Sequence, residues 1–159
     1  MRKRLKEILD KYDGVLLTSP HNMRYFSGFS GGEGAVVITK DTAVVFTDSR
    51  YTEQAQNEAT GFEVKETNDY LKSACELFEE LSLKNVVFED DLLSAAGYKK
   101  LTELCANCEF IFGAADINKL RMVKTPDELD KIRRAEEIGC KAFEHILEFI
   151  RPGALEKDI

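Results

Sequence analysis

A run of glycines near the N-terminus is the first candidate for chemistry in this 159-residue sequence. Gly28, Gly31, Gly32 and Gly34 lie close together, and the backbone N–H groups of such loops bind phosphate when a helix N-terminus follows. The spacing matches neither GxGxxG nor GxxxxGK[ST]. An acidic side chain, Glu33, lies inside the run, and the residues that follow predict a hairpin instead of a helix. We therefore expect the glycines to permit positive φ angles and close backbone approach.

Cysteine and histidine side chains are the second group with possible metal chemistry. Cys105 and Cys108 have the spacing of a zinc-ligand pair. No second pair lies nearby in the sequence, and His21 and His145 are isolated. The four cysteines are irregularly spaced, which is typical of reduced thiols and not of a disulfide framework. We expect no metal site and no cofactor among these residues.

An arginine beside a predicted helix start is the third candidate. Arg50 follows Asp48 and precedes Tyr51, where a positive charge opposes the helix dipole and needs a compensating anion. In the structural interpretation, Asp48 supplies that anion as a local ion pair. In the functional interpretation, the Arg50 guanidinium binds a substrate carboxylate or peptide through bidentate hydrogen bonds. The aromatic ring of Tyr25 either packs in the core or lines a substrate-binding site.

Alternating helix and strand patterns surround these candidates over residues 1–120. Apolar residues at helical spacing indicate helices, and short runs of β-branched residues between turn signals indicate strands. The expected fold is α/β, a mixed β-sheet flanked by helices and containing one antiparallel hairpin. The expected strands are 15–18, 35–39, 42–47, 62–64, 85–88 and 110–112. The expected helices are a first helix that carries the basic N-terminal residues, followed by 21–26, 49–59, 71–81 and 94–105.

A second domain is predicted to begin near residue 120. Thr125 and Glu128 form a capping box with Pro126 at the first helical position. An apolar stripe then runs along one long helix over 126–151, which Pro152-Gly153 ends. We assign 1–120 to the first domain and 121–159 to a linker and the first helix of a second domain that is cut short. Its unpartnered stripe predicts self-association through this helix or disorder of its end.

The composition is that of an acidic globular protein. Hydrophobic residues make up 43% and charged residues 32%, which is enough for a core and argues against disorder. The net charge of −7 disfavours nucleic acid or an anionic membrane as a partner. No apolar run approaches the ~18 residues of a membrane-spanning helix, and no signal-peptide region follows the basic start. We predict a cytoplasmic protein.

Four motifs in the same order resemble the N-terminal domain of the creatinase/prolidase/aminopeptidase P family. The first is Asn-x-x-Tyr-x-x-Gly-Phe-[Ser/Thr]-Gly, which matches Asn22, Tyr25 and Gly28-Phe29-Ser30-Gly31. Thr47-Asp48-Ser49-Arg50-Tyr51 also resembles that family, particularly its bacterial Xaa-Pro peptidases. Residues 120–129 are similar to its interdomain linker, and Arg151-Pro152-Gly153 to the end of the first helix of its catalytic domain.

This resemblance implies a ribonuclease-H-like domain that precedes a catalytic "pita-bread" domain. In the family that second domain holds two divalent metal ions, Mn, Co or Zn, on two Asp, one His and two Glu. All five ligands lie after the segment matched by Arg151-Pro152-Gly153, so none is assigned to this sequence. The resemblance also implies homodimers, in which the N-terminal domain of one chain lies beside the catalytic cleft of the other.

The functional hypothesis is therefore the non-catalytic N-terminal domain of a metal-dependent Xaa-Pro peptidase. The parent would hydrolyse the bond before proline in a peptide, and this domain would contribute to dimerisation and substrate access. The resemblance implies substrate-binding roles at the partner protomer's site for Arg50, Tyr51 and Tyr25, and no catalytic residue here. One alternative is a creatinase-like C–N hydrolase, and another is a non-catalytic peptide-binding module on the same scaffold.

Overall fold

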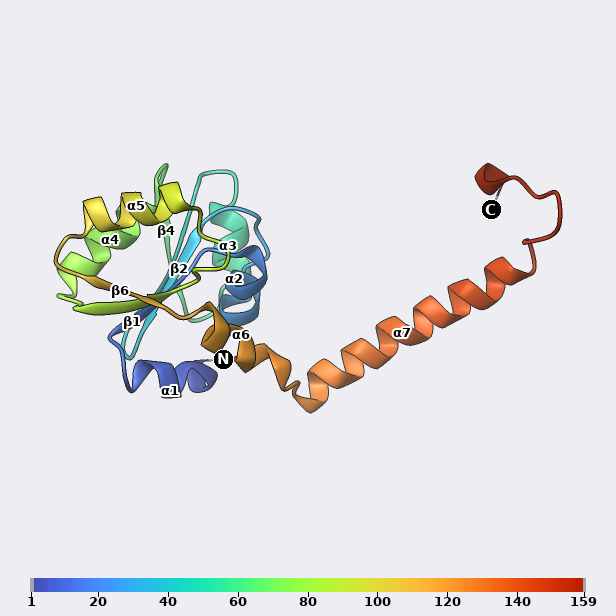
Figure 1. Cartoon of the computed structure of the whole chain (residues 1–159), viewed down its shortest axis with the longest axis horizontal. Helices are drawn as coiled ribbons and strands as arrows, with labels where there is room; N and C mark the ends of the chain where they lie inside the picture. Colours follow the sequence, from blue (N-terminus) through green and yellow to red (C-terminus); the bar gives the residue numbers. More distant parts are fainter. Residues whose placement is uncertain (1, 159) are drawn as a thin grey trace. The chain divides into compact units, whose positions relative to one another are not determined.

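The computed structural model of the chain describes residues 2–158. Its internal contacts divide the chain into two compact units, Met1–Leu120 and Arg121–Ile159 (Figure 1). The first unit contains the sheet and the helices that cover it. The second contains one long helix. That these units are the N-terminal domain and the start of a catalytic domain stays a prediction.

A six-stranded mixed sheet forms the centre of the first unit, with strand order β4-β3-β2-β1-β5-β6. The two contacts β1–β2 and β2–β3 are antiparallel, and the other three are parallel. The antiparallel β2–β3 pair is the predicted hairpin. The strands are β1 Gly14–Leu17, β2 Ala35–Thr39, β3 Ala43–Thr47, β4 Glu63–Glu66, β5 Asn85–Phe88 and β6 Glu109–Phe112.

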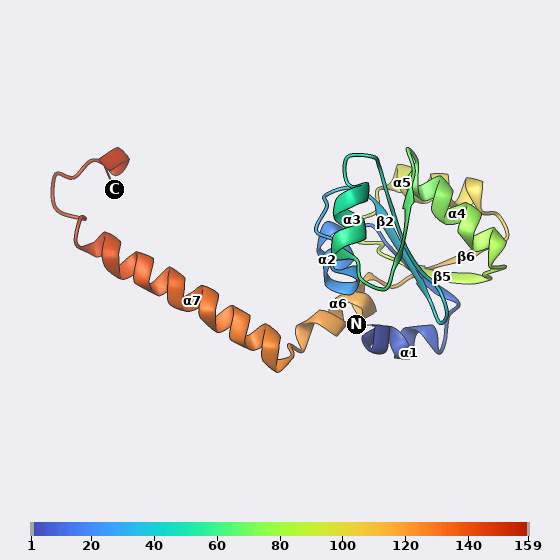
Figure 2. The same ribbon diagram turned by 180° about the vertical axis from the view of Figure 1, so that it is seen from behind.

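Helices cover both faces of this sheet, as Figures 1 and 2 show from opposite sides. Helices α4 (Tyr70–Glu80) and α5 (Ala95–Leu104) pack on one face, and α1 (Lys6–Leu9), α2 (Pro20–Ser27), α3 (Thr52–Glu58) and α6 (Ala114–Met122) on the other. Because successive strand residues face opposite ways, Leu16 packs with the first group and Val15 with the second. Burial on both faces explains the continuous apolar runs of the central strands.

The hairpin closes without the Asn-Gly pair that most favours such turns. The Thr39 N–H donates to the Thr42 carbonyl oxygen at 2.8 Å. The Thr39 hydroxyl in turn accepts the Thr42 N–H at 2.9 Å and the Asp41 N–H at 3.3 Å. A side-chain hydroxyl therefore satisfies the turn's backbone donors and fixes the register, in which Val37 lies opposite Val44.

Helices α3 and α6 of the first unit differ from the sequence expectation. Helix α3 begins at Thr52, because Asp48 to Tyr51 form a tight turn in which the Tyr51 N–H bonds the Asp48 carbonyl oxygen at 3.0 Å. Helix α6 was not predicted. The Ala114 N–H at its first turn bonds Asp90 Oδ1 at 2.9 Å, so its cap comes from the end of another strand and no local pattern announces it.

The long helix α7 spans Pro126–Leu147 and begins with the predicted capping box between Thr125 and Glu128. The expected end at residue 151 was wrong. After Leu147 the backbone tightens, with the Phe149 N–H bonding the Ile146 carbonyl oxygen at 2.9 Å, as is common where helices end.

Among the described residues, no helix is long and apolar enough to cross a membrane.

Candidate functional site

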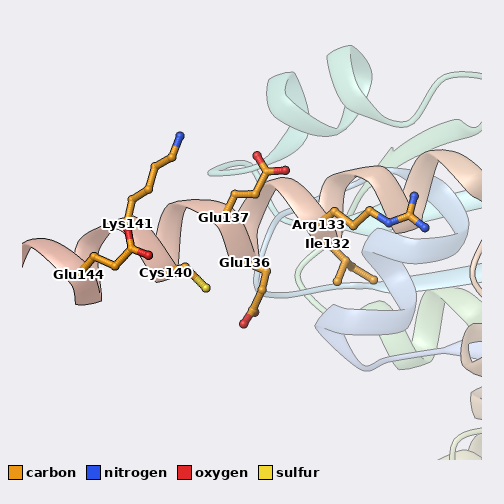
Figure 3. A pocket seen from close by; sticks show the side chains of 7 residues that line it. All are labelled: Ile132, Arg133, Glu136, Glu137, Cys140, Lys141 and Glu144. Carbon is orange, nitrogen blue, oxygen red and sulfur yellow. The ribbon is translucent and has the colours of Figure 1, made fainter.

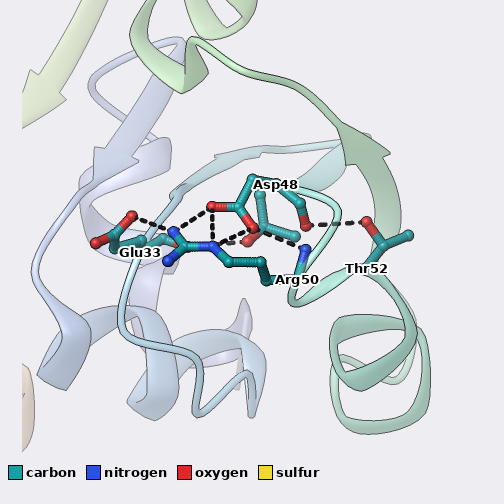
Figure 4. A network of polar contacts seen from close by, with 5 residues as sticks. Glu33, Asp48, Arg50 and Thr52 are labelled. Atoms are coloured by element: carbon teal, nitrogen blue, oxygen red, sulfur yellow. Dashed lines mark hydrogen bonds and ion pairs between the residues drawn. The ribbon is translucent and has the colours of Figure 1, made fainter.

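Arg50 lies at the carboxyl end of β3 and pairs with two carboxylates (Figure 4). Its Nη2 atom donates to Asp48 Oδ2 at 2.6 Å and to Glu33 Oε2 at 2.7 Å. Its Nε atom lies 3.1 Å from both Asp48 oxygens. The expected pair with Asp48 is therefore confirmed. Glu33 was not expected there, since the sequence placed it only inside the glycine run.

The charges of this group decide what it can bind. The Arg50 hydrogen bond is the main cause that lowers the pKa of Asp48, and the same two carboxylates raise the pKa of Arg50. The Arg50 and Glu33 side chains are 62% and 63% exposed, so solvent screens the pairs and their contribution to stability is small. Two carboxylates around one guanidinium leave a net negative group. This arrangement disfavours capture of a free carboxylate unless Glu33 or Asp48 moves away.

Tyr51 joins the Arg50 group through its ring. The Arg50 guanidinium carbon lies 5.4 Å from the centroid of that ring, within cation–π range. The ring also meets Phe29 edge-to-face, with centroids 6.3 Å apart. Phe29 is fully buried and belongs to the glycine-rich loop. The structure thus brings Arg50 and Tyr51 together with that loop.

Tyr25 makes a different set of contacts. Its hydroxyl accepts a hydrogen bond from Arg4 Nη1, and the Arg4 guanidinium lies 5.5 Å from its ring centroid. The same Arg4 Nη1 donates to the carbonyl oxygen of Leu120 at 2.7 Å, near the end of α6. Tyr25 therefore joins the N-terminal turn, a 3-10 helix over Arg2–Leu5, to α2 and α6. A role at a substrate site stays a prediction for this residue.

The glycine-rich loop is shaped by close backbone contacts and by the carboxylate of Glu58, the last residue of α3. Gly28 has a φ of 89°, and a Cβ there would lie 2.9 Å from the Glu58 carbonyl oxygen. Gly34 has a φ of 152°, and its Cβ would lie 2.4 Å from the Phe46 carbonyl oxygen. The Ser30 N–H, which an anion would need, donates to Glu58 Oε2 at 2.7 Å. These contacts support the structural interpretation of the glycines.

Glu89 is a buried polar residue that the sequence analysis missed. It is 1% exposed at the end of β5, and its Oε2 accepts the N–H groups of Thr18 and Ser19 at 2.6 and 2.9 Å. Its Oε1 accepts the Ser19 hydroxyl and the Asn22 amide, each at 2.6 Å. Asn22 Nδ2 also bonds Asn118 Oδ1 at 3.1 Å. The first residue of the Asn-x-x-Tyr motif is thus a partner of a buried carboxylate.

Three of the four thiols lie in the core between the sheet and its α4–α5 layer. Cys75, Cys105 and Cys108 are buried and Cys140 is exposed, all with free thiols. Burial is the main cause that raises the pKa of Cys75 and of Cys108 to about 12. Such thiols carry little thiolate at neutral pH and are poor nucleophiles.

The metal ions that the resemblance implies do not fit the residues present here. Within residues 2–158, no group of three or more His, Cys, Asp or Glu side chains is arranged to hold a metal ion. A hollow along α7 is lined by Ile132, Arg133, Glu136, Glu137, Cys140, Lys141 and Glu144 (Figure 3). All of these come from a single helix, so the hollow lacks a second wall.

The fold and motifs define a mixed-sheet α/β domain, and the comparison with known families places it. The family model "Creatinase/Prolidase N-terminal domain" matches residues 1–123. This chain belongs to that family. An uncharacterized peptidase of Bacillus subtilis is 36% identical over 145 residues, which is 91% of this chain and 41% of that protein. The chain therefore spans less than half the length of this relative.

Solved structures agree with this placement. The X-Pro aminopeptidase from Thermotoga maritima has a TM-score of 0.87 at 30% identity, covering 98% of this chain and 46% of that one. The Xaa-Pro dipeptidase from Bacillus anthracis has a TM-score of 0.87 at 37% identity, covering 98% and 44%. The N-terminal domain of the cytoplasmic peptidase PepQ from Mycobacterium tuberculosis has a TM-score of 0.70 at 27% identity, covering 75% and 96%.

Proposed function

We propose that this chain acts as the N-terminal, non-catalytic domain of a metal-dependent Xaa-Pro peptidase of aminopeptidase P or prolidase type. The observation that carries the proposal is the alignment of nearly the whole chain with Xaa-Pro peptidases at a TM-score of 0.87. The relatives named above are peptidases, which favours this activity over the creatinase-like alternative. A similar domain named as part of a cytoplasmic peptidase supports the cytoplasm as its location.

In this proposal, the parent hydrolyses the bond before proline, using two divalent metal ions held outside this chain. The domain contributes to a homodimer and to substrate access. Arg50 and Tyr51 support the second role because the exposed Arg50 guanidinium lies over the ring of the partly buried Tyr51 at the end of β3. The net negative charge of that group favours contact with a neutral or positively charged part of a peptide, such as its amino terminus.

A chimera tests the proposal directly. The whole chain would replace the aligned segment of the Bacillus anthracis Xaa-Pro dipeptidase, to which it is 37% identical. We expect the chimera to hydrolyse Xaa-Pro peptides with added Mn²⁺, Co²⁺ or Zn²⁺, and the isolated chain to show no activity. A folded chimera without activity, or metal-dependent cleavage by the isolated chain, would contradict the proposal.

The same chimera tests Arg50. Arg50 holds the Glu33 and Asp48 carboxylates in place. Replacing it with glutamine should release them and raise KM several-fold, while leaving kcat nearly unchanged because none of these groups would touch the reacting bond. Lys65→Gln is a matched control, since Lys65 is a partly exposed cation on β4. An equal effect of both variants would assign the change to overall charge.

A further inference from the structure

The two edges of the sheet carry opposite kinds of side chain. The outer strand β4 reads Glu63-Val64-Lys65-Glu66, so three of its residues are charged. The outer strand β6 reads Glu109-Phe110-Ile111-Phe112, and only its first residue is charged. Charged side chains on an edge strand prevent another strand from pairing with it. Edge β4 has this protection and edge β6 largely lacks it.

The backbone of β6 presents unused pairing groups along this edge. The Glu109 N–H donates to the Lys84 carbonyl oxygen at 2.8 Å, and the Gly113 N–H to the Phe88 carbonyl oxygen at 3.2 Å. Because strand residues alternate in direction, the N–H and C=O groups of Phe110 and Phe112 point away from β5. Within the described residues, no strand pairs with that side of β6. The edge therefore offers donors and acceptors at two positions.

An ordered aromatic side chain lies beside these groups. Phe112 is 65% exposed, yet its ring centroid lies 5.3 Å from that of Phe88 and 5.5 Å from that of Tyr98. These contacts hold one side of the ring and leave the rest in solvent. A large exposed aromatic next to an open strand edge is a preformed apolar contact for a partner.

We propose that β6 is a self-association surface, on which β6 of a second copy of this chain pairs in antiparallel orientation. Among the registers that the backbone directions allow, the one that pairs the outward groups of both phenylalanines places Phe110 opposite Phe112 of the second copy and Ile111 on the two-fold axis. Each Phe110–Phe112 pair exchanges both of its N–H···O=C bonds. The two sheets become one continuous sheet, and the exposed rings pack beside each other across the junction.

The edge complements itself, which favours a second copy over an unrelated strand. In this register Glu109 lies opposite Gly113, so no charge faces a like charge at either end of the pair. A two-fold interface needs one surface that supplies both halves, and the outward groups of Phe110 and Phe112 meet that requirement. Each copy contributes one strand of four residues, and so small an interface is weak. The association therefore depends on concentration. The proposal names a surface for the homodimer contribution in the proposed function, and its tests on the isolated chain involve no peptidase assay.

A cysteine on the two-fold axis gives the sharpest test. Opposed residues of a non-hydrogen-bonded antiparallel pair have Cα atoms about 4.5 Å apart, which is close enough for a disulfide. The variant Ile111→Cys is made in a Cys140→Ser background, because Cys140 is the exposed native thiol. Diamide accepts the two electrons and two protons that a pair of thiols releases as the disulfide forms. The expected product is a covalent dimer on a non-reducing gel.

The opposite edge provides the matched control. Lys65→Cys in the same background places a thiol within the charged strand β4, and the Cys140→Ser chain alone reports any reaction of the buried thiols. We expect neither to give a covalent dimer under conditions in which Ile111→Cys does. Circular dichroism of each variant verifies that the sheet is intact. Equal cross-linking from β4 and β6 would overturn the proposal.

Sedimentation equilibrium measures the same association without a cross-link. Phe112→Lys should raise the dimer dissociation constant at least about tenfold, since it puts a charge on the edge, as β4 has. Leu92→Lys is its control, because Leu92 is 60% exposed in the same unit and lies outside β6; it should leave the constant unchanged. Phe143→Lys removes an exposed apolar residue of α7 and separates any association through that helix.

These variants leave each outcome decisive. A dimer weakened by Phe112→Lys and unaffected by Leu92→Lys and Phe143→Lys supports pairing through β6. A dimer lost only in Phe143→Lys assigns the association to α7 and overturns the proposal. A chain that stays monomeric at roughly 1 mM, where even weak pairs form, overturns it as well.

Discussion

Replacement of Glu89 by glutamine removes the charge at the centre of a buried hydrogen-bond group. Glutamine keeps the size of the side chain but turns one acceptor oxygen into a donor. That donor then faces either the N–H groups of Thr18 and Ser19 or the Ser19 hydroxyl and Asn22 amide. Two charge-assisted bonds are lost, at about 1.5–3 kcal/mol each. The lower cost of burying a neutral group offsets part of this loss, so we expect a net destabilisation of about 3 kcal/mol.

Urea and thermal unfolding measure this loss in the whole chain. Near-ultraviolet circular dichroism is the suitable signal, because it reports the packed aromatic rings of the first unit. A loss of about 3 kcal/mol lowers the melting temperature by roughly 10 °C in a unit of this size. Glu58→Gln is the control, since Glu58 also accepts a backbone N–H, from Ser30, but at the surface; it should shift the midpoint much less. A Glu89→Gln chain that unfolds at the wild-type midpoint would refute the reasoning.

Three further predictions concern single residues. Asp48 should titrate below its ordinary pKa of 3.8, and Arg50→Gln should raise that pKa in an NMR titration. The ion pair stabilises the fold at pH values above the ordinary carboxyl pKa, and this stabilisation is lost as the pH falls through the lowered pKa of Asp48. A thiol reagent at pH 8 should modify Cys140 alone in the native chain and all cysteines after unfolding, as mass spectrometry would show. Gly28→Ala should lower the melting temperature, at a cost of at least about 1 kcal/mol, because of the positive φ and the Glu58 carbonyl oxygen; an unchanged melting temperature would contradict the steric argument.

The parts of the fold that could be predicted are those with local causes. Ser19 caps α2 ahead of Pro20, a local pattern, and its side chain accepts the Asn22 N–H at 3.2 Å. The hairpin, the central strands and the capping box of α7 likewise follow from patterns within a few residues. Arg50 and Asp48 are two positions apart, and their pair was expected for the same reason.

The missed features have causes that are distant in the sequence. The donors that surround Glu89 lie 67 to 71 residues before it, and residues 89–91 carry charges that look like a solvated loop. Asp90, which caps α6, is 24 residues from the N–H that it accepts. Glu33 reaches Arg50 across 17 residues. In each case the fold brings the partners together, so no local rule could identify them.

The contact between Arg4 and Leu120 joins the fourth residue of the chain to the last residue of its first unit, 116 positions later. During synthesis on a ribosome, the N-terminal turn must wait until nearly the whole unit has emerged before this contact can form. The parallel pairing of β1 with β5 is delayed similarly, because β5 follows about seventy residues after β1. A nascent chain that ends before Leu120 therefore lacks the hydrogen bond that links its N-terminal turn to the end of the first unit. The N-terminal turn is synthesised first, but its hydrogen bond to the Leu120 carbonyl oxygen can form only after Leu120 has emerged.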